Sequence, residues 1–395
     1  MEILDKLNPK LKESIKVIID ICCNLDIRVY VVGGCVRDAI LDEEINDIDI
    51  CIEADTILLL PYLKKIAKCK YHEDFQTSSI VFSNGILIDI VRCRFETYKY
   101  NGALPTIKPS GVYDDLYRRD FTINALAYDL ASGKLIDYFG GMDDINSKII
   151  KKIHKDSYNE DPTRIFRAVR YAVRYNFDLY DYDEVVFCLK SGVMSTISSD
   201  RVIKEILLIC REKDWKSCFI LCFRLGIFVL DKNKLGKENE IFSFRNFDDR
   251  LLNFFYCIKK DKFKEYLIDN SLVNIHIKNV FKRYALEEEQ IIKEIKNTCN
   301  NYEIYLLLYK MDYYERVLLC YNSQIKYKII NYETRLSKIK LEVDGRYLKN
   351  LGIKEGRVIG NILAYLLKIK LCTHMQDDVS FLTKNLGEIL NVCEY

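Results

Sequence analysis

The sequence lacks several features that would assign a protein to a class at once. Its 395 residues include only five prolines, four histidines and one tryptophan, and the formal net charge is +2. A chain so close to neutral has no overall attraction for nucleic acid, so a nucleic-acid surface must come from local clusters among its 60 lysines and arginines. No apolar run is long enough to span a membrane, and the N-terminal residues have no signal-peptide core. We therefore expect no membrane partner.

The cysteines argue against two further classes. Fifteen are present, but they are scattered through apolar segments and form no CxxC pair, which is not the pattern of a disulfide scaffold. None of the four histidines lies at ligand spacing from a group of cysteines, so a zinc site is not expected either. Buried thiols in a reducing compartment fit this pattern, and we predict a cytoplasmic protein.

Hydrophobic periodicity divides the chain into two parts. Residues 8–26 are predicted to form a helix, and β-rich runs follow at 27–34, 47–54, 78–94 and 124–141. Gly85 and Gly133 mark hairpin turns within the last two runs. From about residue 141 the apolar period is that of helices, and few prolines interrupt it. The sequence therefore predicts an α+β protein, in which a head with a mixed sheet precedes a helical body.

Two aspartates lie two positions apart in the segment NDIDICI. In a strand, residues i and i+2 point to the same face, so Asp47 and Asp49 share one face while the isoleucines face the core. Two convergent carboxylates are costly unless a cation neutralises them, and oxygen ligands suit Mg²⁺. Asp89, in an otherwise apolar strand, is a third candidate for a two-metal phosphoryl-transfer site. Alternatively, the pair is only the solvated end of a strand.

Gly33 and Gly34 end the apolar run that precedes these aspartates. A strand, a glycine turn and the helix start CVRDAIL would together present free amides and the positive end of a helix dipole, which bind phosphates. An ordinary turn is the alternative. A phosphate-binding turn thirteen residues before Asp47 nevertheless favours a nucleotide site.

These residues carry a resemblance to a known family. The segment GGCVRDAILDEEINDIDI resembles the first motif of the class II tRNA nucleotidyltransferases, the CCA-adding enzymes of the polymerase β superfamily. Later segments are similar to the second to fifth motifs, in the family's order: RRDFTINALAYD, DYFGGMDDI, EDPTRIFRAVRYA and ISSDRVIKEI. The resemblance implies a polymerase-β-like nucleotidyltransferase head at 1–140, followed by an all-helical neck at 141–215, a body at 216–300 and a tRNA-binding tail at 301–395.

The resemblance also implies roles for residues of the head. Asp47 and Asp49 would bind Mg²⁺, and Asp89 would complete the catalytic acids. The implied nucleotide-binding residues are Gly33, Gly34, Arg37, Arg119, Asp120 and Asn124. Among these, Arg119 would meet the triphosphate and Asp120 the ribose hydroxyl.

In the neck, the resemblance implies that Asp161 and Arg164 read the base edge of the incoming CTP or ATP, and that Arg167 and Arg170 lie beside the phosphates. Arginine can donate two parallel hydrogen bonds and aspartate can accept from an amine, and C and A both carry an amine beside a ring acceptor. The residues leave a second interpretation open, because Asp161 followed by Pro162 is also a good helix start.

Two positions depart from the family's pattern. Gln76 lies where many relatives have a glycine before a threonine, and Glu355 precedes a glycine where proline is common. The nearby glycines Gly352, Gly356 and Gly360 suit either phosphate binding or helix capping and packing, and their spacing favours the second.

The implied function is template-independent addition of CMP and AMP, from CTP and ATP, to the tRNA 3′ end, in CCA addition or repair. Lysine-rich segments would hold the acceptor and T stems of the tRNA, although such runs are more often solvated helix faces. No protein partner is evident. The alternatives are a variant that adds only CC or only A, a poly(A) polymerase, and a non-catalytic RNA-binding protein. The presence of Asp47, Asp49 and Arg164 argues against the last.

Overall fold

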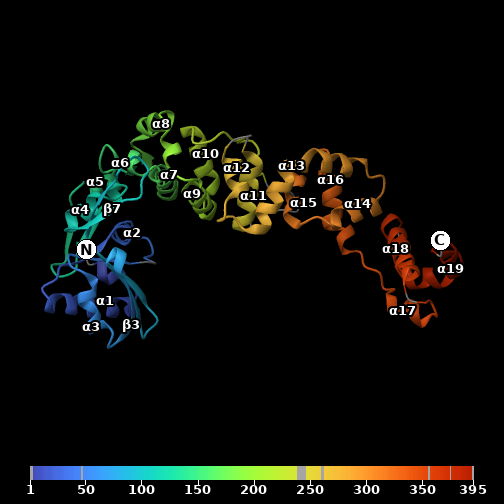
Figure 1. The fold of residues 1–395 in the computed structure, drawn as a ribbon, viewed down its shortest axis with the longest axis horizontal. Helices are drawn as coiled ribbons and strands as arrows, with labels where there is room; N and C mark the ends of the chain where they lie inside the picture. Colours follow the sequence, from blue (N-terminus) through green and yellow to red (C-terminus); the bar gives the residue numbers. More distant parts are fainter. Residues whose placement is uncertain are drawn as a thin grey trace. The chain divides into compact units, whose positions relative to one another are not determined.

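The computed structural model describes residues 3–45, 48–237, 246–258, 262–354, 356–373 and 375–393. The chain divides into two compact units, Met1–Phe228 and Val229–Tyr395. The first unit contains a mixed sheet and then helices (Figure 1). Among the described residues, the second is helical apart from an isolated bridge between Leu230 and Ile258. The predicted α+β fold is confirmed, whereas the finer division at residues 140, 215 and 300 stays a prediction.

A seven-stranded sheet forms the centre of the first unit. In spatial order its strands are β3 (Ala67–His72), β4 (Thr77–Phe82), β5 (Leu87–Arg92), β2 (Asp49–Ile52), β1 (Val29–Val32), β8 (Leu126–Asp129) and β9 (Lys134–Asp137). Neighbouring strands are antiparallel except β2 and β5, which are parallel. The sequence of β1, VYVV, is buried on both faces, so it is an unbroken apolar run rather than an alternating one.

The parallel pair brings two carboxylates side by side. Its register places Asp49 opposite Asp89 and Ile50 opposite Ile90. Side chains alternate along a strand, so both aspartates lie on one face, while both isoleucines are fully buried on the other. Neighbouring strands lie about 4.8 Å apart, so the two aspartates start from adjacent backbone positions.

The first unit has helices before, between and after the strands of the main sheet. Those of the first unit are α1 (Pro9–Asn24), α2 (Gly34–Ile40), α3 (Leu60–Leu63), α4 (Val112–Tyr117), α5 (Gly141–Asn146), α6 (Ser157–Glu160), α7 (Thr163–Tyr175), α8 (Tyr182–Lys190), α9 (Ser199–Arg211) and α10 (Trp215–Leu225). Small sheets pair β6 (Arg94–Thr97) with β7 (Thr106–Pro109), and β10 (Ile149–Ile150) with β11 (Asp178–Leu179). Helix α1 begins where expected, because the Asn8 side chain accepts from the amide of Leu11 at 2.9 Å.

The predicted helix at 8–26 is found as α1, and the predicted β-rich runs contain six strands of the main sheet. Gly85 and Gly133 lie in the expected turns with φ of +85° and +69°. Strands β3, β6 and β7 were not predicted. Their sequences, AKCKYH, RFET and TIKP, are rich in polar residues and none of their residues is buried, so they lack the apolar pattern of a core strand.

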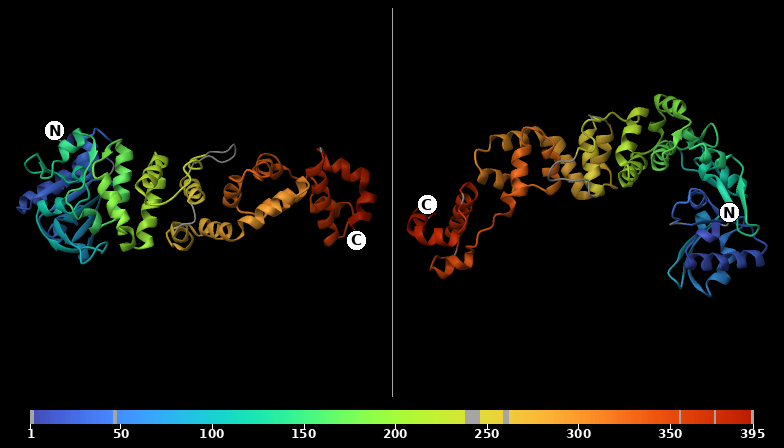
Figure 2. Two further views of the ribbon diagram at one scale, coloured as in Figure 1. Left: turned by 90° about the horizontal axis from the view of Figure 1, so that it is seen from above. Right: turned by 180° about the vertical axis from the view of Figure 1, so that it is seen from behind.

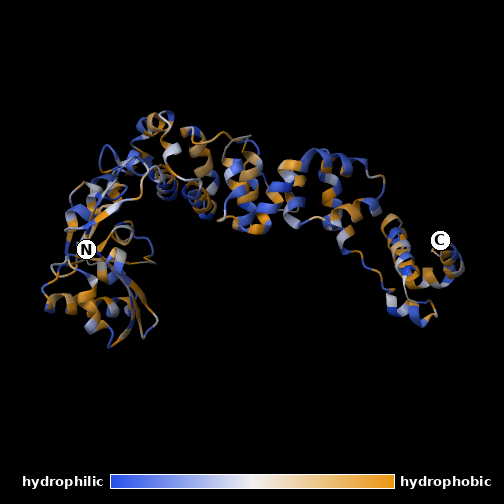
Figure 3. Cartoon of the chain, viewed as in Figure 1, coloured by the Kyte–Doolittle hydropathy of each residue, from blue (hydrophilic) through white to orange (hydrophobic). Residues whose placement is uncertain are grey.

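The second unit is built from helices. They are α11 (Phe247–Cys257), α12 (Lys262–Asp269), α13 (Ile275–Asn297), α14 (Asn301–Tyr309), α15 (Tyr313–Cys320), α16 (Lys326–Thr334), α17 (Gly345–Asn350), α18 (Arg357–Cys372) and α19 (Asp378–Cys393), seen from two further sides in Figure 2. Hydrophobic and hydrophilic residues alternate along them (Figure 3), as in helices that bury one face. No helix in the described ranges is both long enough and apolar enough to cross a membrane.

Two of the three tail glycines lie at helix ends, and Gly360 lies within α18. Gly352 follows α17 with φ +83°, and Gly356 precedes α18 with φ +117°. These are conformations that L side chains rarely adopt, and they are common where a helix stops or starts. The capping interpretation therefore accounts for both glycines.

The buried ammonium group of Lys328 caps the C-terminal end of α13, the longest helix described in the second unit. Nζ of Lys328, on α16, donates to the carbonyls of Ile295, Lys296 and Thr298 at 2.8–2.9 Å, and to the Thr298 hydroxyl at 2.9 Å. These carbonyls belong to the end of α13, where helical carbonyls have no partner within the helix and the dipole attracts a cation. Lys328 is only 5% exposed, so its ammonium replaces water at this end.

We expect Lys328→Met to lower the free energy of unfolding of the second unit by about 2–3 kcal/mol, because buried carbonyls lose charge-assisted hydrogen bonds. Urea titration followed by far-UV circular dichroism measures the change. Lys282→Met is the matched control, since Lys282 is an exposed lysine on α13 itself. Equal midpoints for the two variants would contradict the role of Lys328.

Candidate active site

A cavity of about 490 Å³ lies beside β2 in the first unit. Its charged lining residues are Arg37, Arg118, Arg119, Arg164, Arg167, Arg201, Asp49, Glu96, Asp120 and Asp161. Six cations against four carboxylates favour a ligand with several negative charges. Gly34, Asn124 and Tyr171 also contribute to the wall.

A chain of hydrogen bonds organises one wall of the cavity. Nη1 of Arg37 donates to Oδ1 of Asn124, and Nδ2 of Asn124 donates to Oδ1 of Asp120 at 2.9 Å. Oδ2 of Asp120 accepts from Nε of Arg167 at 2.6 Å. Asp38 holds Arg37 in turn, because Nε and Nη2 of the arginine donate to Oδ1 of Asp38 at 2.9 and 2.8 Å. These links join α2 to α7, so residues predicted from distant motifs form one network.

The network keeps its central carboxylate charged. Burial alone would raise the pKa of Asp120, but the positive charge of Arg167 and the hydrogen bonds from Asn124 and Arg167 outweigh it and lower the pKa. The guanidinium of Arg37 also lies over the rings of Tyr175 and Tyr171, at 4.8 and 5.3 Å from their centroids. The positions of these charged groups are therefore fixed before any ligand binds.

A second buried carboxylate fixes the arginines that follow α4. Asp115 is fully buried, and its oxygens accept from Arg118 at 2.7 and 2.9 Å and from Arg119 at 3.0 Å. Burial would raise the pKa of Asp115, but the charges of Arg119 and Arg118 outweigh it, and the pKa is lowered. Nε of Arg119 is buried and has no hydrogen-bond partner within the described part of the chain. An anion in the cavity would stabilise this guanidinium.

Arg164 reaches the cavity from the first turn of α7, but several of its donors already have partners. Nη1 donates to the hydroxyl of Ser157 at 2.7 Å, and Nη2 donates to the carbonyl of Arg118 at 2.8 Å. The Tyr98 hydroxyl accepts more weakly at 3.4 Å. Arg164 is therefore held rigidly, with 5% of its surface exposed at the cavity wall.

Asp161 makes a helix-capping contact and also lies in the cavity wall. Its Oδ1 accepts from the amide of Thr163 at 3.0 Å, which is a capping contact, although α7 begins at Thr163 and not at Pro162. The same oxygen accepts from Nη2 of Arg201 at 2.6 Å, and Asp161 lines the cavity. Nη1 of Arg201 donates to the Gly102 carbonyl at 2.8 Å, so this arginine ties the segment around residue 102 to α7.

The strand aspartates lie where two cavities meet. Asp49 lines the first cavity and also a second one of about 520 Å³, which Asp89 lines together with Asn8 and the turn between β4 and β5. Asp47 lies outside the described residues. The described ranges contain no group of three or more His, Cys, Asp or Glu side chains that could hold a metal ion, here or elsewhere, so this site offers two described carboxylates. Exposed carboxylates on adjacent strands are nevertheless oxygen ligands that suit a hard divalent cation.

Two of the predicted nucleotide-binding residues do not line the cavity. Gly33 donates its amide to the carbonyl of Leu126 at 2.9 Å, which leaves Gly34 at the wall. Arg170 lies further round α7 and donates to Glu212 at 2.9 Å. Of the two arginines predicted to lie beside phosphates, Arg167 lines the cavity and Arg170 does not.

Sequence reasoning missed part of the lining. Glu96 accepts from Arg118 at 3.2 Å and from the Tyr98 hydroxyl at 3.0 Å, and both partners line the cavity with it. Strand β6, which carries Glu96, was not predicted, so these residues had no assigned place. Arg118 and Arg201 lie inside the quoted motif segments, and their positions there could have identified them.

Comparison with known proteins agrees with this geometry. Residues 29–151 match the poly A polymerase head domain. An A-adding tRNA nucleotidyltransferase of Geobacter sulfurreducens is 31% identical over 388 residues, which cover 88% of this chain and 43% of the relative. A CCA-adding enzyme of Geobacillus sp. is 33% identical over 234 residues, which cover 57% of this chain and 56% of the relative. The chain thus spans about half the length of the curated relatives it matches.

The solved structure of a Thermotoga maritima CCA-adding enzyme complexed with tRNA_CCA extends the likeness to both units. It superposes with a TM-score of 0.77 at 25% identity, and the match covers 98% of this chain and 97% of that chain. The resemblance to the class II tRNA nucleotidyltransferase and poly(A) polymerase family is therefore confirmed. Class II tRNA nucleotidyltransferases and their relatives generally use divalent metal ions, and Asp49 and Asp89 offer suitable oxygens.

The close approach of Gly33 to Arg119 can be tested by substitution. Gly33 has φ +77°, and a Cβ there would overlap Nη1 of Arg119. Gly33→Ala is expected to lower the free energy of unfolding by about 2–3 kcal/mol, because a Cβ in this backbone conformation (φ +77°, ψ −131°) costs about 1–3 kcal/mol and the mostly buried Arg119 guanidinium must also move. Gly85→Ala is the control, since Gly85 has φ +85° and no heavy atom within 4 Å of its Cβ position. Equal losses in urea titrations would contradict the contact.

Proposed function

We propose that the protein is a template-independent tRNA nucleotidyltransferase, which adds CMP and AMP from CTP and ATP to the 3′ end of tRNA in CCA addition or repair. The observation that carries the proposal is the position of Asp49 in the wall of two cavities of opposite character. The first is lined by six arginines and suits a triphosphate. The second holds Asp49 and Asp89 as its charged residues and suits the hydroxyl end of an RNA.

In the proposed reaction, the 3′ hydroxyl oxygen of the RNA bonds to the α-phosphorus of the nucleotide, and the bond to the pyrophosphate oxygen breaks. Attack in line requires the hydroxyl and the leaving group on opposite sides of that phosphorus. Asp49, shared by both cavities, lies where the two would meet. Arg119 and Arg167, held by Asp115 and Asp120, are the groups that would neutralise the leaving pyrophosphate.

The proposed cofactor is Mg²⁺, held by Asp49 and Asp89 together with Asp47. When bound, such an ion supplies an activated hydroxyl and charge for the leaving group. The chain's own contribution is to hold the carboxylates on paired strands, at positions that the sheet fixes.

We assign base selection to the start of α7. Asp161 and Arg164 both line the triphosphate cavity, and neighbouring side chains hold both of them. A rigid acceptor beside a rigid donor complements the amine and ring nitrogen of C or A, and not the reversed pattern of G or U. Asp120 is assigned to the ribose hydroxyl, within a network that Asn124 keeps in place.

A second candidate is the addition of A alone. It is favoured by the Geobacter sulfurreducens relative, which is named an A-adding enzyme and matches 88% of this chain. Addition of CC alone, a poly(A) polymerase and a non-catalytic RNA-binding protein are the remaining alternatives. The proposed location is cytoplasmic, and the proposed tRNA contacts are the acceptor and T stems.

The central test supplies the protein and Mg²⁺ with tRNAs that end before, within and one residue short of CCA, together with labelled CTP or ATP. Two C residues and then one A support CCA addition, and A alone supports the second candidate. In either case Asp49→Ala should reduce incorporation at least a thousandfold, because the carboxylate acts at the reacting atoms. Unchanged far-UV circular dichroism shows that this variant folds. A long A tail, or residual activity near wild type in the variant, would overturn the proposal.

Arg164→Ala tests base selection separately. We expect the preference for CTP and ATP over UTP, measured as a ratio of kcat/KM values, to fall at least tenfold, since a fixed donor to the base edge is lost. Arg170→Ala is the comparison, because Arg170 lies on α7 outside the cavity lining. An unchanged ratio in a folded Arg164→Ala protein would leave only a structural role for this arginine.

A further inference from the structure

A small cationic cavity lies next to the proposed nucleotide site. It has a volume of about 120 Å³, and its lining residues are Phe75, Gln76, Arg92, Arg94, Ile107, Lys108 and Pro109. Three cations and no carboxylate line it. Its size suits one phosphate group and is too small for a whole nucleotide, which needs several hundred Å³.

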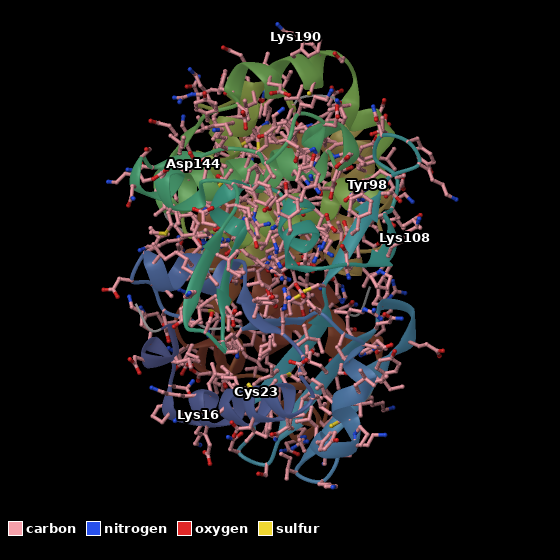
Figure 4. All side chains as sticks on the ribbon, turned by 90° about the vertical axis from the view of Figure 1, so that its left-hand side faces the viewer. Lys16, Cys23, Tyr98, Lys108, Asp144 and Lys190 are labelled. Carbon is pink, nitrogen blue, oxygen red and sulfur yellow. The ribbon has the colours of Figure 1, made fainter. Side chains whose placement is uncertain are left out.

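The cavity and the nucleotide site share a wall. Glu96 lines the nucleotide site, and its Oε1 accepts from Nε of Arg94, which lines the small cavity, at 3.0 Å. The same oxygen accepts from Arg118 on the other side at 3.2 Å. In Figure 4 the side chains of Tyr98 and Lys108, one from each cavity, lie on the same side of the first unit. A ligand in the small cavity is therefore close to the site where a nucleotide would bind.

Two of the cations are available to an anion. Glu96 balances the charge of Arg94, but no carboxylate in the described residues lies within salt-bridge distance of Arg92 or Lys108. Lys108 is exposed on β7, and Arg92 is half-buried at the end of β5. Two unbalanced cations in one cavity favour a phosphate, which accepts from several donors at once.

Gln76 positions one of these cations. Its Oε1 accepts from Nη1 of Arg92 at 2.7 Å, while its carbonyl accepts from the Thr56 hydroxyl at 3.1 Å. Gln76 has φ +49°, the left-handed conformation that a glycine would adopt with less strain. The departure from the family's glycine thus places a side chain that lines the cavity and holds Arg92.

An aromatic ring lies beside the phosphate-sized cavity. Phe75 is 55% exposed and lines the cavity next to Gln76. Exposed rings beside cations are typical of surfaces that bind unpaired nucleic acid, because a base stacks on the ring while its phosphate meets the charge. Binding of an inorganic anion would require only the cationic side chains and not the exposed ring of Phe75.

We propose that this cavity, formed by Arg92, Arg94, Lys108 and Gln76, binds a backbone phosphate of the RNA substrate, with the adjacent base stacked on Phe75. The choice of RNA as ligand rests on the proposed function. The cavity is distinct from the site that holds the nucleotide, so it acts on RNA affinity and not on nucleotide affinity.

The test measures binding without catalysis. The dissociation constant of the full-length protein for a tRNA lacking its 3′ CCA is determined without nucleotide or Mg²⁺, over a range of salt concentrations. Arg92→Gln and Lys108→Gln should each raise Kd about tenfold, which corresponds to one charge-assisted hydrogen bond. Each should also reduce the salt slope by about one. Lys68→Gln, which removes an exposed lysine of β3 outside the cavity, should change neither beyond twofold.

Gln76→Gly tests the positioning of Arg92 separately from the charge of the cavity. It removes the partner of Arg92 without changing any charge and relieves a left-handed backbone, so we expect a folded protein with a Kd raised two- to threefold and an unchanged salt slope. Phe75→Ala should raise Kd severalfold, again with the slope unchanged.

The outcomes distinguish this proposal from the proposed function. Weakened binding and a reduced slope in the two cation variants support the phosphate site, even if the protein adds no nucleotide in the activity assay. Wild-type Kd and slope in folded Arg92→Gln and Lys108→Gln proteins would overturn it, and so would an equal loss in Lys68→Gln. If calorimetry with inorganic phosphate shows binding that Arg92→Gln abolishes while RNA affinity stays unchanged, the cavity is a free-anion site and the RNA assignment is wrong.

Discussion

The parallel pairing of β2 with β5 determines where the two strand carboxylates of the candidate active site lie. The pair is the only parallel one in a sheet that is otherwise antiparallel across its described strands, and it aligns Asp49 with Asp89. A shift by one residue would turn each aspartate into the core and each isoleucine toward water, so the buried face fixes the register. The hydrophobic core thus positions the two strand carboxylates.

Around that point, buried carboxylates hold arginines in fixed orientations. Asp115 and Asp120 are both largely buried, and each is paired with guanidinium groups that lower its pKa. Burying such charges is costly, and pairing them offsets the cost only when the geometry is good. The benefit is an arrangement of cations that requires no reorganisation when a polyanion arrives. Stability and preorganisation therefore rest on the same hydrogen bonds in this site.

The sequence was most informative where a physical pattern was strong. Apolar periodicity located α1 and the central strands, and the aspartates of β2 and β5 were found because each interrupts an apolar run. It was least informative where position depends on tertiary contacts. Strand β6 has no core pattern of its own, so Glu96 could not be placed, and the direction in which Arg170 points is set by Glu212, far away in sequence. Local sequence patterns predict helices and strands, whereas contacts between residues far apart in sequence decide which side of a helix faces the site.

The position of Asp49 between two cavities has a consequence for turnover. In the proposed reaction the nucleotide and the RNA occupy different cavities, which differ in charge, so pyrophosphate can leave one cavity while the RNA stays bound in the other. An enzyme with that layout can exchange its monomer between rounds without releasing the growing chain. The number of rounds before release is then governed by how tightly the polymer is held at a distance from the reacting atoms, and not by the reaction itself.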